Sequence, residues 1–432
     1  MRKLIAGIAA ASLALALSAC GGTNANKTAG GSEGTAAASE VDVVSWWSAG
    51  SEKDGYNALQ EVFKTQNGGI KFVNQAISGG GGSQAKQKLQ ADLAAKNPPD
   101  TYQAHAGAEL SADIAAGYLQ DVSPLYDEFK LRDAFPKDLV DRVTVDGKIY
   151  SVPSNIHRAN VVWVSKAALD KAGIDPTKAP ADLDAWLADM QKLRAAGVQY
   201  PLAVGMAWTQ LELLETTLIA DLGADNYNKL MAGDLKWDDA SVTKAFTHFD
   251  KLMKFADPKF FGEDWEPAMT GVIKGDGTQA YSVMGDWTPP AFHAAKKTYN
   301  QDFFAWPVPG TNGVFDFLAD SFTLPVGAKH PDGTKAWLKT ISSKEGQIAF
   351  NKIKGSIPAR SDLAADEISQ FSKYQQDAMK SFKSDKIVSS IAHGAALPIT
   401  VTEAMNSSLG KYSGGSIDIA GLQKEFAAAA TK

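Results

Sequence analysis

The chain has 432 residues, of which 44% are hydrophobic and 21% charged, with 49 acidic residues against 43 lysines and arginines. This is the composition of a globular protein, and a length above roughly 250 to 300 residues predicts two hydrophobic cores and therefore two lobes. The net charge of −6, uninterrupted by a Lys/Arg cluster, argues against nucleic acid and anionic membrane surfaces as partners.

The first segment is predicted to be a lipoprotein signal peptide over residues 1–19. Arg2 and Lys3 precede an apolar stretch that is too short and too rich in alanine for a settled transmembrane helix. Cleavage would leave Cys20, the only cysteine, at the new N-terminus, where its thiol can carry a thioether-linked diacylglycerol. The pattern resembles the lipobox of bacterial lipoproteins, and an ordinary secretory signal with an incidental cysteine is the alternative. We therefore expect an extracytoplasmic protein that a lipid anchors to the cell membrane.

Residues 20–40 hold no large apolar side chain and are predicted to be the lipidated cysteine and a flexible tether. Beyond them the hydrophobic pattern alternates between strands and helices. Strands are expected over 41–47, 70–77 and 101–104, and helices over 56–66 and 84–96. The order β-α-β-α-β predicts a parallel sheet covered by helices.

From residue 170 the pattern changes to longer amphipathic helices, such as those expected over 183–196 and 241–255. Strand patterns return at 279–284, 303–308 and 315–324, before a helix over 334–342. A chain that leaves one α/β unit, builds another and then offers strands again is expected to cross between lobes more than once. Such crossings form a hinge.

The motifs of common enzymes and metal sites are missing. The run Gly79–Gly82 lacks the Lys-Ser/Thr ending of a P-loop and the spacing of a dinucleotide-binding loop, and no G-x-S-x-G elbow is present. None of the six histidines lies four residues from another or beside a carboxylate pair at metal-ligand spacing. We therefore predict no catalytic residues, no metal and no cofactor.

Aromatic residues stand beside polar ones at the predicted strand ends. Trp46 and Trp47 follow the first strand, at the carboxyl edge where open α/β sheets bind ligands. Because adjacent strand residues face opposite sides, one of the two is expected to pack inside and the other to line a cleft. Gln103 and His105 end a later strand with side chains on one face, although a structural role for His105 is the alternative.

Two further indoles and two carboxylates follow later in the sequence, at Trp265, Asp286-Trp287 and Asp320. Together, indoles, amides, carboxylates and imidazoles without a catalytic set fit a sugar. A pyranose ring presents C–H patches to an aromatic face, while its hydroxyls donate and accept hydrogen bonds. Two stacked faces and several hydrogen bonds can supply the roughly 8 kcal/mol of a micromolar complex.

Eight short motifs, in this order, resemble the extracellular solute-binding proteins of bacterial ABC sugar importers, and most closely their glucose-type monosaccharide binders. They are Ser45–Trp47, Pro98–Thr101, Gln103–Gly107, Val152–Arg158, Val283–Trp287, Asp320–Phe322, Lys354–Ile357 and His393–Ala395. The resemblance runs from about Val41 to Leu397.

The resemblance implies an α/β, two-lobed periplasmic-binding-protein-like fold of class II type, with hinge crossings and an interlobe ligand cleft. The N-terminal lobe would comprise 41–155 plus 310–357, and the helix-rich C-terminal lobe 156–309 plus 358–432. Crossings are expected at 152–157 and around 319–321. A monosaccharide would be delivered to ABC permease subunits powered by a separate ATPase, and the protein is expected to be a monomer.

The resemblance also implies roles for individual residues. Trp47 and Trp287 would stack on the sugar ring, Trp265 would close one wall, and Trp46 would lie beside them. Five polar residues would bond the sugar hydroxyls: Gln103, His105, Asp320, Lys354 and His393.

Two alternatives remain at this point. The receptor would bind a disaccharide or oligosaccharide if the cleft were larger. A secreted glycoside hydrolase would need two carboxyl groups roughly 5 to 9 Å apart, for which Asp286 and Asp320 are the candidates.

Overall fold

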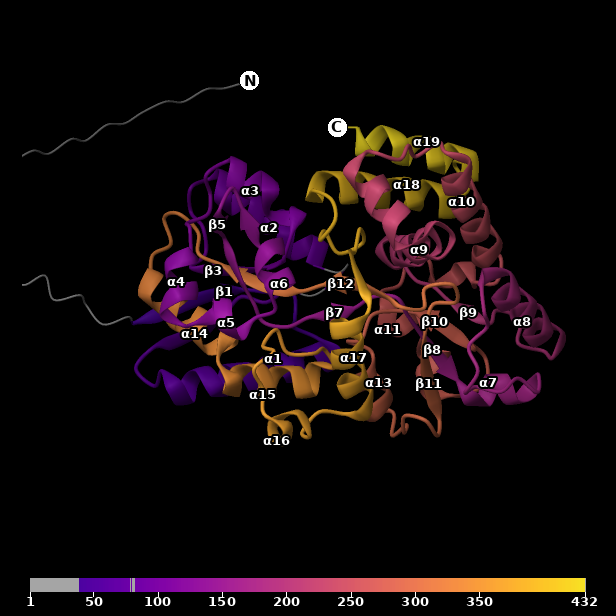
Figure 1. Cartoon of the computed structure of the whole chain (residues 1–432), viewed down its shortest axis with the longest axis horizontal. Helices are drawn as coiled ribbons and strands as arrows, with labels where there is room; N and C mark the ends of the chain where they lie inside the picture. The colour runs from indigo at the N-terminus through magenta and orange to yellow at the C-terminus, as the bar shows by residue number, and fades with distance from the viewer. Residues whose placement is uncertain (1–38, 78, 80–81, 432) are drawn as a thin grey trace, which may run out of the picture. The chain divides into compact units, whose positions relative to one another are not determined.

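Two sheets, one in each lobe, organise the chain (Figure 1). The computed structural model describes residues 39–77, 79 and 82–431, which belong to one compact unit. The predicted signal peptide, Cys20 and residues 21–38 of the predicted tether lie outside the described residues.

The N-terminal lobe is built on a five-stranded sheet with the order β2-β1-β3-β13-β6. Its strands are β1 (Glu40–Val44), β2 (Lys71–Asn74), β3 (Thr101–His105), β6 (Ser151–Pro153) and β13 (Asp320–Thr323). β1 pairs in parallel with both β2 and β3, which confirms the predicted parallel start of the sheet. β13 is antiparallel to β3 and β6.

Helices and a small hairpin surround this sheet. They are α1 (Gly50–Gln66), α2 (Ser83–Ala94), η2 (Ala108–Leu110), α3 (Ser111–Ala115), α4 (Ser123–Glu128), α5 (Leu131–Ala134), α6 (Lys137–Arg142), β4 (Thr144–Val145), β5 (Lys148–Ile149), α14 (Pro331–Ser342) and α15 (Lys344–Lys354). α16 (Ala365–Ile368) and α17 (Lys373–Ser384) follow α15.

The start of α1 matters for the site. The apolar periodicity that indicates a helix begins at Tyr56, but the helix begins at Gly50, because its first turns are polar and carry no such pattern. Tyr56, Leu59 and Phe63 form its fully buried face. The rings of Tyr56 and Phe63 lie 6.2 and 5.7 Å from Trp337 of α14, so aromatic packing holds this helix in place.

The C-terminal lobe is built on a four-stranded sheet with the order β11-β8-β10-β9. Its strands are β8 (Val161–Ser165), β9 (Leu202–Ala203), β10 (Tyr281–Val283) and β11 (Phe303–Pro307). Its helices are α7 (Lys166–Lys171), α8 (Leu183–Ala195), α9 (Ala207–Ala232), α10 (Ala240–Met253), η3 (Pro258–Phe260), α11 (Trp265–Ala268), α12 (Thr270–Lys274), α13 (Pro289–Ala294), α18 (Ile399–Ser413) and α19 (Ile419–Ala430). Helices α8 and α10 lie where helices were predicted over 183–196 and 241–255.

A third sheet, β14-β12-β7, connects the two lobes. It contains β7 (His157–Arg158), β12 (Val314–Leu318) and β14 (Lys386–Ser389). Ala319 alone separates β12 from β13, so the single strand predicted over 315–324 is two strands in two sheets. Likewise β6 of the N-terminal lobe leads within a few residues to β7. Chain crossings thus occur at both predicted places, whereas the predicted lobe boundaries stay a prediction.

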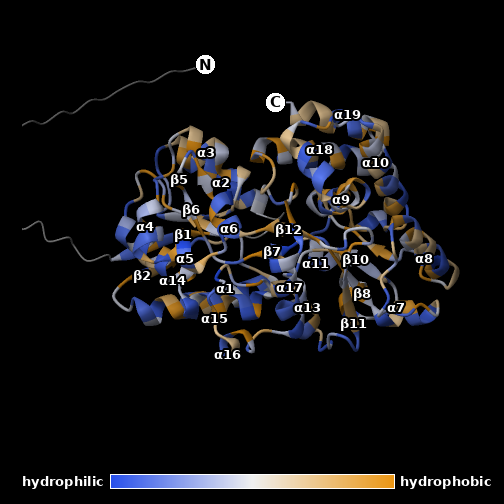
Figure 2. Ribbon diagram, in the orientation of Figure 1, coloured by the Kyte–Doolittle hydropathy of each residue, from blue (hydrophilic) through white to orange (hydrophobic). Residues whose placement is uncertain are grey.

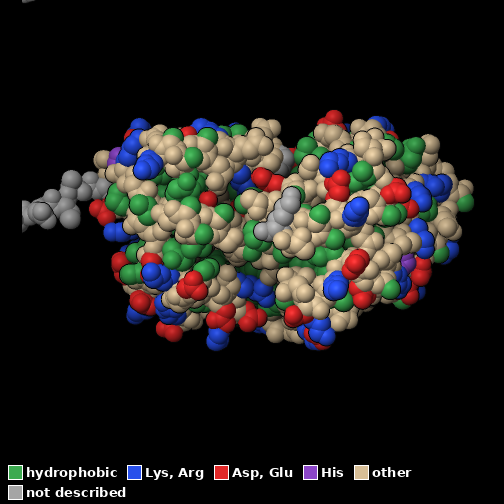
Figure 3. Space-filling view, turned by 90° about the horizontal axis from the view of Figure 1, so that it is seen from above, with side chains coloured by type: hydrophobic (Ala, Val, Ile, Leu, Met, Phe, Trp, Pro, Cys, Tyr) green, Lys and Arg blue, Asp and Glu red, His purple; other side chains and the backbone are tan. Residues whose placement is uncertain are grey.

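Figure 2 shows hydrophilic and hydrophobic residues interleaved along the helices of both lobes, as expected for helices with one buried face. On the face shown in Figure 3, acidic and basic side chains lie among one another. Within the described ranges, no helix combines the length and apolarity that a bilayer span requires.

Candidate ligand-binding site

Side chains of both lobes and of the linking strands line a cavity of about 260 Å³. Eight of the nine side chains predicted to bind the ligand lie on its wall: Trp46, Trp47, His105, Trp265, Trp287, Asp320, Lys354 and His393. The structure adds His157, Trp208, Glu52 and Glu266 among others. Residues far apart in the sequence are therefore brought to one place.

The edge of the N-terminal sheet explains why these residues meet. β1 and β3 are parallel neighbours, so Trp46 and His105 lie at the same edge of the sheet. β13 runs in the opposite direction and therefore places its first residue, Asp320, at this edge, paired with His105. The ends of three strands thus supply an indole, an imidazole and a carboxylate.

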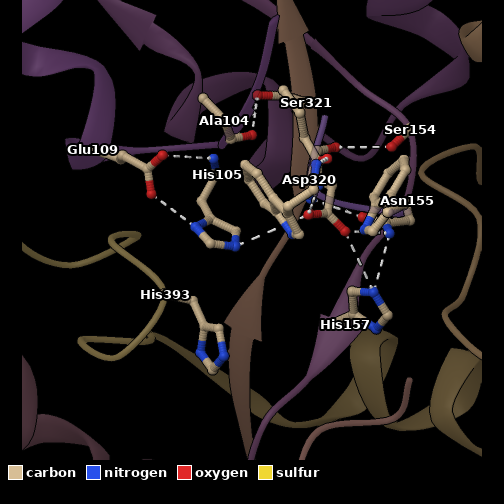
Figure 4. A network of polar contacts seen from close by, with 12 residues as sticks. Ala104, His105, Glu109, Ser154, Asn155, His157, Asp320, Ser321 and His393 are labelled. Carbon is tan, nitrogen blue, oxygen red and sulfur yellow. Dashed lines mark hydrogen bonds and ion pairs between the residues drawn. The ribbon is translucent and has the colours of Figure 1, made fainter. Parts of the chain in front are cut away.

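Asp320 is the centre of a buried polar network (Figure 4). Its Oδ1 accepts a hydrogen bond from Gln103 Nε2 at 2.8 Å, and its Oδ2 accepts one from Asn155 Nδ2 at 2.7 Å. Burial alone would raise the pKa of Asp320, but the hydrogen bond and charge of His157, with the charges of His105 and Lys354, hold it well below its usual range. The carboxylate is therefore ionised and fixed in orientation.

His157 bridges two carboxylates. Its Nδ1 pairs with Asp286, and its Nε2 lies 3.4 Å from Oδ2 of Asp320. Burial and the Lys354 charge lower the pKa of His157, but the charges and hydrogen bonds of the two aspartates outweigh them and raise it. The two carboxylates thus favour the charged form of this imidazole.

His105 is held from the opposite side. Its Nδ1 lies 2.7 Å from Oε2 of Glu109, which also accepts from Lys86 Nζ at 2.9 Å. Burial works against ionisation of Glu109, yet Lys86 and His105 lower its pKa to about 2. This ionised glutamate fixes the plane of the His105 ring (Figure 4).

Lys354, the last residue of α15, brings a cation into the cavity wall. Its Nζ donates to Oε1 of Glu52 at 2.6 Å, and the lysine side chain is 2% exposed. It lies 5.8 Å from the ring centroid of Trp47 and 5.7 Å from that of Trp287. Lys354 therefore connects the polar groups to the indoles.

Indoles form most of the opposite wall. Trp287 lies 5.2 Å from the His157 ring and 6.3 Å from Trp208, measured between centroids. Trp208 is anchored by Nε1, which donates to Asp264 at 3.0 Å, and Trp265 begins α11 directly after that aspartate. These rings present flat apolar faces to the cavity.

The tandem tryptophans differ from the prediction that one would be internal and one would face a cleft. Both line the cavity, and both also pack in the core of the N-terminal lobe. The chain leaves β1 at Val44, so the strict alternation of a strand no longer applies at these positions. Gly82 supports Trp46, because it adopts a φ of +92° and a Cβ there would lie 2.8 Å from the indole.

Gln103 is the one predicted site residue that does not line the cavity. Its Oε1 accepts from Ser45 Oγ at 2.6 Å and from the Trp46 amide at 3.2 Å, while its amide nitrogen donates to Asp320. Gln103 therefore lies behind the wall and holds other residues in position.

Trp208 and His157 belong to the site although the sequence did not indicate them as ligand contacts. Trp208 follows a two-residue strand at the start of a helix, a place with no local signal for a site. In the sequence, His157 was noted only as part of the predicted chain crossing between the lobes at 152–157. Its pairing with Asp286, next to Trp287, appears only when the strands are assembled.

The two carboxyl groups considered for a glycosidase, those of Asp286 and Asp320, do not both line the cavity. Asp286 is fully buried, bonds to His157 and to the Arg158 amide, and does not line the cavity. The two candidate carboxyl groups therefore do not flank a common space. Among the described residues, no group of His, Cys, Asp and Glu is arranged to hold a metal ion.

Two α/β lobes joined by crossing strands, with a small aromatic and polar cavity between them, define a class of proteins that enclose a ligand. The family model described as bacterial extracellular solute-binding protein matches residues 49–348. The chain belongs to this family.

Relatives and solved structures agree with this assignment. The chain is 36% identical to an ABC transporter extracellular-binding protein of Pyrococcus horikoshii, over 83% of this chain and 80% of the relative. It is 33% identical to a probable sugar-binding periplasmic protein of Mesorhizobium japonicum, over 88% and 90%. Both relatives are named as binding proteins, in agreement with the prediction of a binding protein rather than an enzyme.

The same fold is found in a chitin oligosaccharide binding protein, with a TM-score of 0.77 and 19% identity over 91% of this chain and 98% of that one. The solute receptor AcbH, described with an exclusive preference for β-D-galactopyranose, gives a TM-score of 0.76 and 20% identity over 91% and 98%. At these identities the likeness shows the fold alone, which is the two-lobed fold that was predicted.

Proposed function

We propose that this protein is the substrate-binding component of an ABC sugar importer and that it binds one monosaccharide, glucose or a close epimer. The observation that carries the proposal is that indoles and charged side chains line the same cavity. Trp208, Trp265 and Trp287 of the C-terminal lobe line it together with Asp320, His105 and Lys354 of the N-terminal lobe, beside which Trp46 and Trp47 also lie. A pyranose has matching faces, because its C–H patches stack on aromatic rings and its hydroxyls bond to charged groups.

The size of the cavity favours a single sugar ring. Its volume of about 260 Å³ is below the roughly 300–1,000 Å³ of pockets for drug-sized ligands. Named relatives support the chemical class: a xylose/arabinose-binding protein of Haloferax volcanii at 26% identity, and a glucose-binding protein of Saccharolobus solfataricus at 23%. An oligosaccharide would need a larger cavity. The fold itself does not discriminate between the two ligand sizes, because a chitin oligosaccharide binding protein shares it.

Ligand binding would act on the lobes. A sugar that contacts both lobes stabilises their closed arrangement over an open one, and the permease would recognise that closed surface. We further propose that Cys20 carries the lipid anchor. Cys20→Ser should release the protein from the membrane fraction, and continued membrane association of this variant would contradict the anchor.

Native mass spectrometry of the gently purified protein tests the ligand proposal. We expect one adduct with the mass of a hexose, which excess free hexose of the right epimer exchanges. An adduct with the mass of a di- or trisaccharide would overturn the monosaccharide proposal while keeping the sugar importer. Titration calorimetry with pure sugars then identifies the epimer.

A further inference from the structure

The segment 390–394 carries His393 into the cavity and is held by both lobes. It follows β14, and the Ser390 amide donates to the carbonyl of Phe317 in β12 at 2.9 Å. From the N-terminal lobe, the amide of Glu109 donates to the Gly394 carbonyl at 2.8 Å. Gly394 permits this approach, because it adopts a φ of +63° and a Cβ there would lie 2.8 Å from Oε2 of Glu109.

Glu215 of α9 holds the same segment from inside the C-terminal lobe. Its fully buried carboxylate accepts hydrogen bonds from the amides of Ile391 and Ala392 at 2.6 and 2.8 Å. It also accepts one from the hydroxyl of Ser390, with Oγ to Oε1 at 2.8 Å. Three donors therefore converge on a side chain that does not line the cavity.

This arrangement determines where the hydrogens lie. Because the Ser390 hydroxyl hydrogen points to Glu215, the Ser390 oxygen is an acceptor for its other neighbours. One of these is Nδ1 of His393, at 2.9 Å, so Nδ1 carries a hydrogen. Burial, followed by the charges of His105, His157 and Lys86, keeps the pKa of His393 well below its usual range, so the ring is neutral.

In this tautomer Nε2 of His393 has no hydrogen and is a hydrogen-bond acceptor. The residue is 7% exposed, lines the cavity, and its Nε2 has no hydrogen-bond partner within the described part of the chain. In Figure 4 the ring is joined by no dashed line to the other residues drawn. A buried acceptor without a partner costs free energy, so this nitrogen is suited to a ligand that donates to it.

Asp316 of the linking strand β12 keeps Glu215 in the accepting role. Burial raises the pKa of Asp316, and the adjacent Glu215 raises it further, so Asp316 is the neutral acid of the pair. Other ionisable groups near the pair are Glu212, Arg158 and Tyr227. Neither carboxyl oxygen of Asp316 has a hydrogen-bond partner among the described residues, so the three donors of segment 390–394 depend on Glu215.

We propose that Glu215 is a positioning residue for ligand recognition: through Ser390 it fixes the Nδ1–H tautomer of His393, so that this position of the site selects a ligand hydroxyl that donates a hydrogen. The proposal rests on the proposed sugar-binding function, whereas its first test does not need a ligand. Glu215 contacts the ligand only through this chain of hydrogen bonds.

The test uses Glu215→Gln. A glutamine can accept from the two amides with its oxygen, while its NH₂ group donates to Ser390. The serine hydroxyl is then free to donate to Nδ1 of His393, and the tautomer should reverse to Nε2–H. The matched control is Glu212→Gln, a fully buried glutamate one turn away on α9 whose carboxyl oxygens make no hydrogen bond to segment 390–394 within the described part of the chain.

The first readout is ¹⁵N NMR of the imidazole rings in the ligand-free protein, with the His393 signals assigned by their absence in His393→Asn. We expect the Nδ1–H tautomer in the wild type and in Glu212→Gln, and a shift toward Nε2–H in Glu215→Gln. An unchanged tautomer in Glu215→Gln would overturn the proposal. Should that variant not fold, Ser390→Ala, which removes the acceptor for Nδ1, should also increase the Nε2–H population.

The second readout is affinity for deoxyfluoro analogues of the hexose that binds, since fluorine cannot donate a hydrogen bond. At one ring position the wild type should reject the fluoro analogue by more than tenfold, and Glu215→Gln should reduce this rejection to less than threefold. Unchanged rejection at every position would contradict the proposal while leaving sugar binding intact. If the wild type binds no sugar, the proposed function fails, and the tautomer measurement still tests Glu215.

Discussion

The two walls of the cavity use different side chains. The wall of the N-terminal lobe presents Asp320, His105 and Lys354, each fixed by a hydrogen-bond partner, beside the indoles of Trp46 and Trp47. The opposite wall presents Trp208, Trp265 and Trp287, which are positioned mainly by packing. Directional bonds discriminate between hydroxyl patterns, whereas flat rings remove apolar area from water regardless of epimer. We therefore expect the polar wall to set selectivity and the aromatic wall to set general affinity.

The difference extends behind the walls, where His105 and His393 are each backed by a buried glutamate. Glu109 behind His105 is paired with Lys86, and its pKa is lowered. Glu215 behind His393 lies among other carboxyl groups, and burial raises its pKa. Glu109 is thus an ionised hydrogen-bond partner of His105 in the N-terminal lobe. In the C-terminal lobe, the titration of Glu215 depends on that of the neighbouring Asp316, and burial raises the pKa of both.

The largest effect is expected from Asp320→Ala. The substitution leaves the amides of Gln103 and Asn155 and the His157 ring without their shared partner. Because Asp320 would accept hydrogen bonds from the ligand with a charged group, and its loss also frees the side chains that it positions, affinity should fall more than hundredfold in calorimetry, about 3 kcal/mol. The exposed Asp127→Ala on α4 serves as control and should bind as the wild type does. Retained affinity in Asp320→Ala would show that the polar wall does not contact the ligand.

Glu109 should make stability depend on pH in the acidic range. A lowered pKa contributes stability above the unfolded value of about 4.5, and this contribution is lost as pH falls toward about 2. In urea unfolding, Glu109→Gln should therefore lose less free energy of unfolding than the wild type over this range, by on the order of 3 kcal/mol.

Glu212→Gln should behave in the opposite way, which sharpens the contrast between the lobes. Burial and Glu215 raise the pKa of Glu212, so its ionisation costs stability as pH rises above about 4.5. Relative to the wild type, the glutamine variant should gain stability as pH rises toward neutrality. Parallel pH profiles for both variants and the wild type would contradict the assigned ionisation states.

Trp287→Ala should weaken binding of every accepted hexose by at least tenfold, about 1.4 kcal/mol, with little change in their order of preference. Trp47→Ala should also weaken binding more than tenfold, but it should destabilise the fold as well, because Trp47 packs on Tyr56, Phe322 and Phe350. Calorimetry and thermal unfolding of the two variants separate these effects. A reversed order of hexoses in Trp287→Ala would contradict the division between the walls.

The smallest effect is expected from Gln103→Met. Gln103 does not line the cavity, and its loss removes one hydrogen bond to Asp320, so affinity should fall about threefold to tenfold. A loss as large as that of Asp320→Ala would mean that Gln103 contacts the ligand directly.

Much of the site could be predicted from the residues at strand ends. An aromatic or polar residue directly after a buried strand is expected at the edge of a sheet, where ligands bind. Trp46, His105 and Asp320 were found in this way or through the family resemblance. Trp208 and His157 were missed because their places depend on the assembly of separate strands and helices. Ser390 and Glu215 are 175 positions apart, and no local pattern predicts that their side chains bond.

The fold was predictable to a similar extent. Periodicity indicated the parallel β1, β2 and β3, but it merged β12 with β13, since only Ala319 separates them and no turn residue marks the boundary. It also missed the polar first turns of α1, which bring Glu52 into the cavity wall. The ends of strands and helices could not be predicted where they depend on contacts with residues far away in the sequence.

Titration calorimetry of the wild type with a panel of hexoses tests the central claim most directly. The account predicts one site per chain that accepts a single hexose or its close epimer, with a negative heat-capacity change from the covered indoles. Absence of heat from every hexose, in protein freed of endogenous ligand, would contradict it.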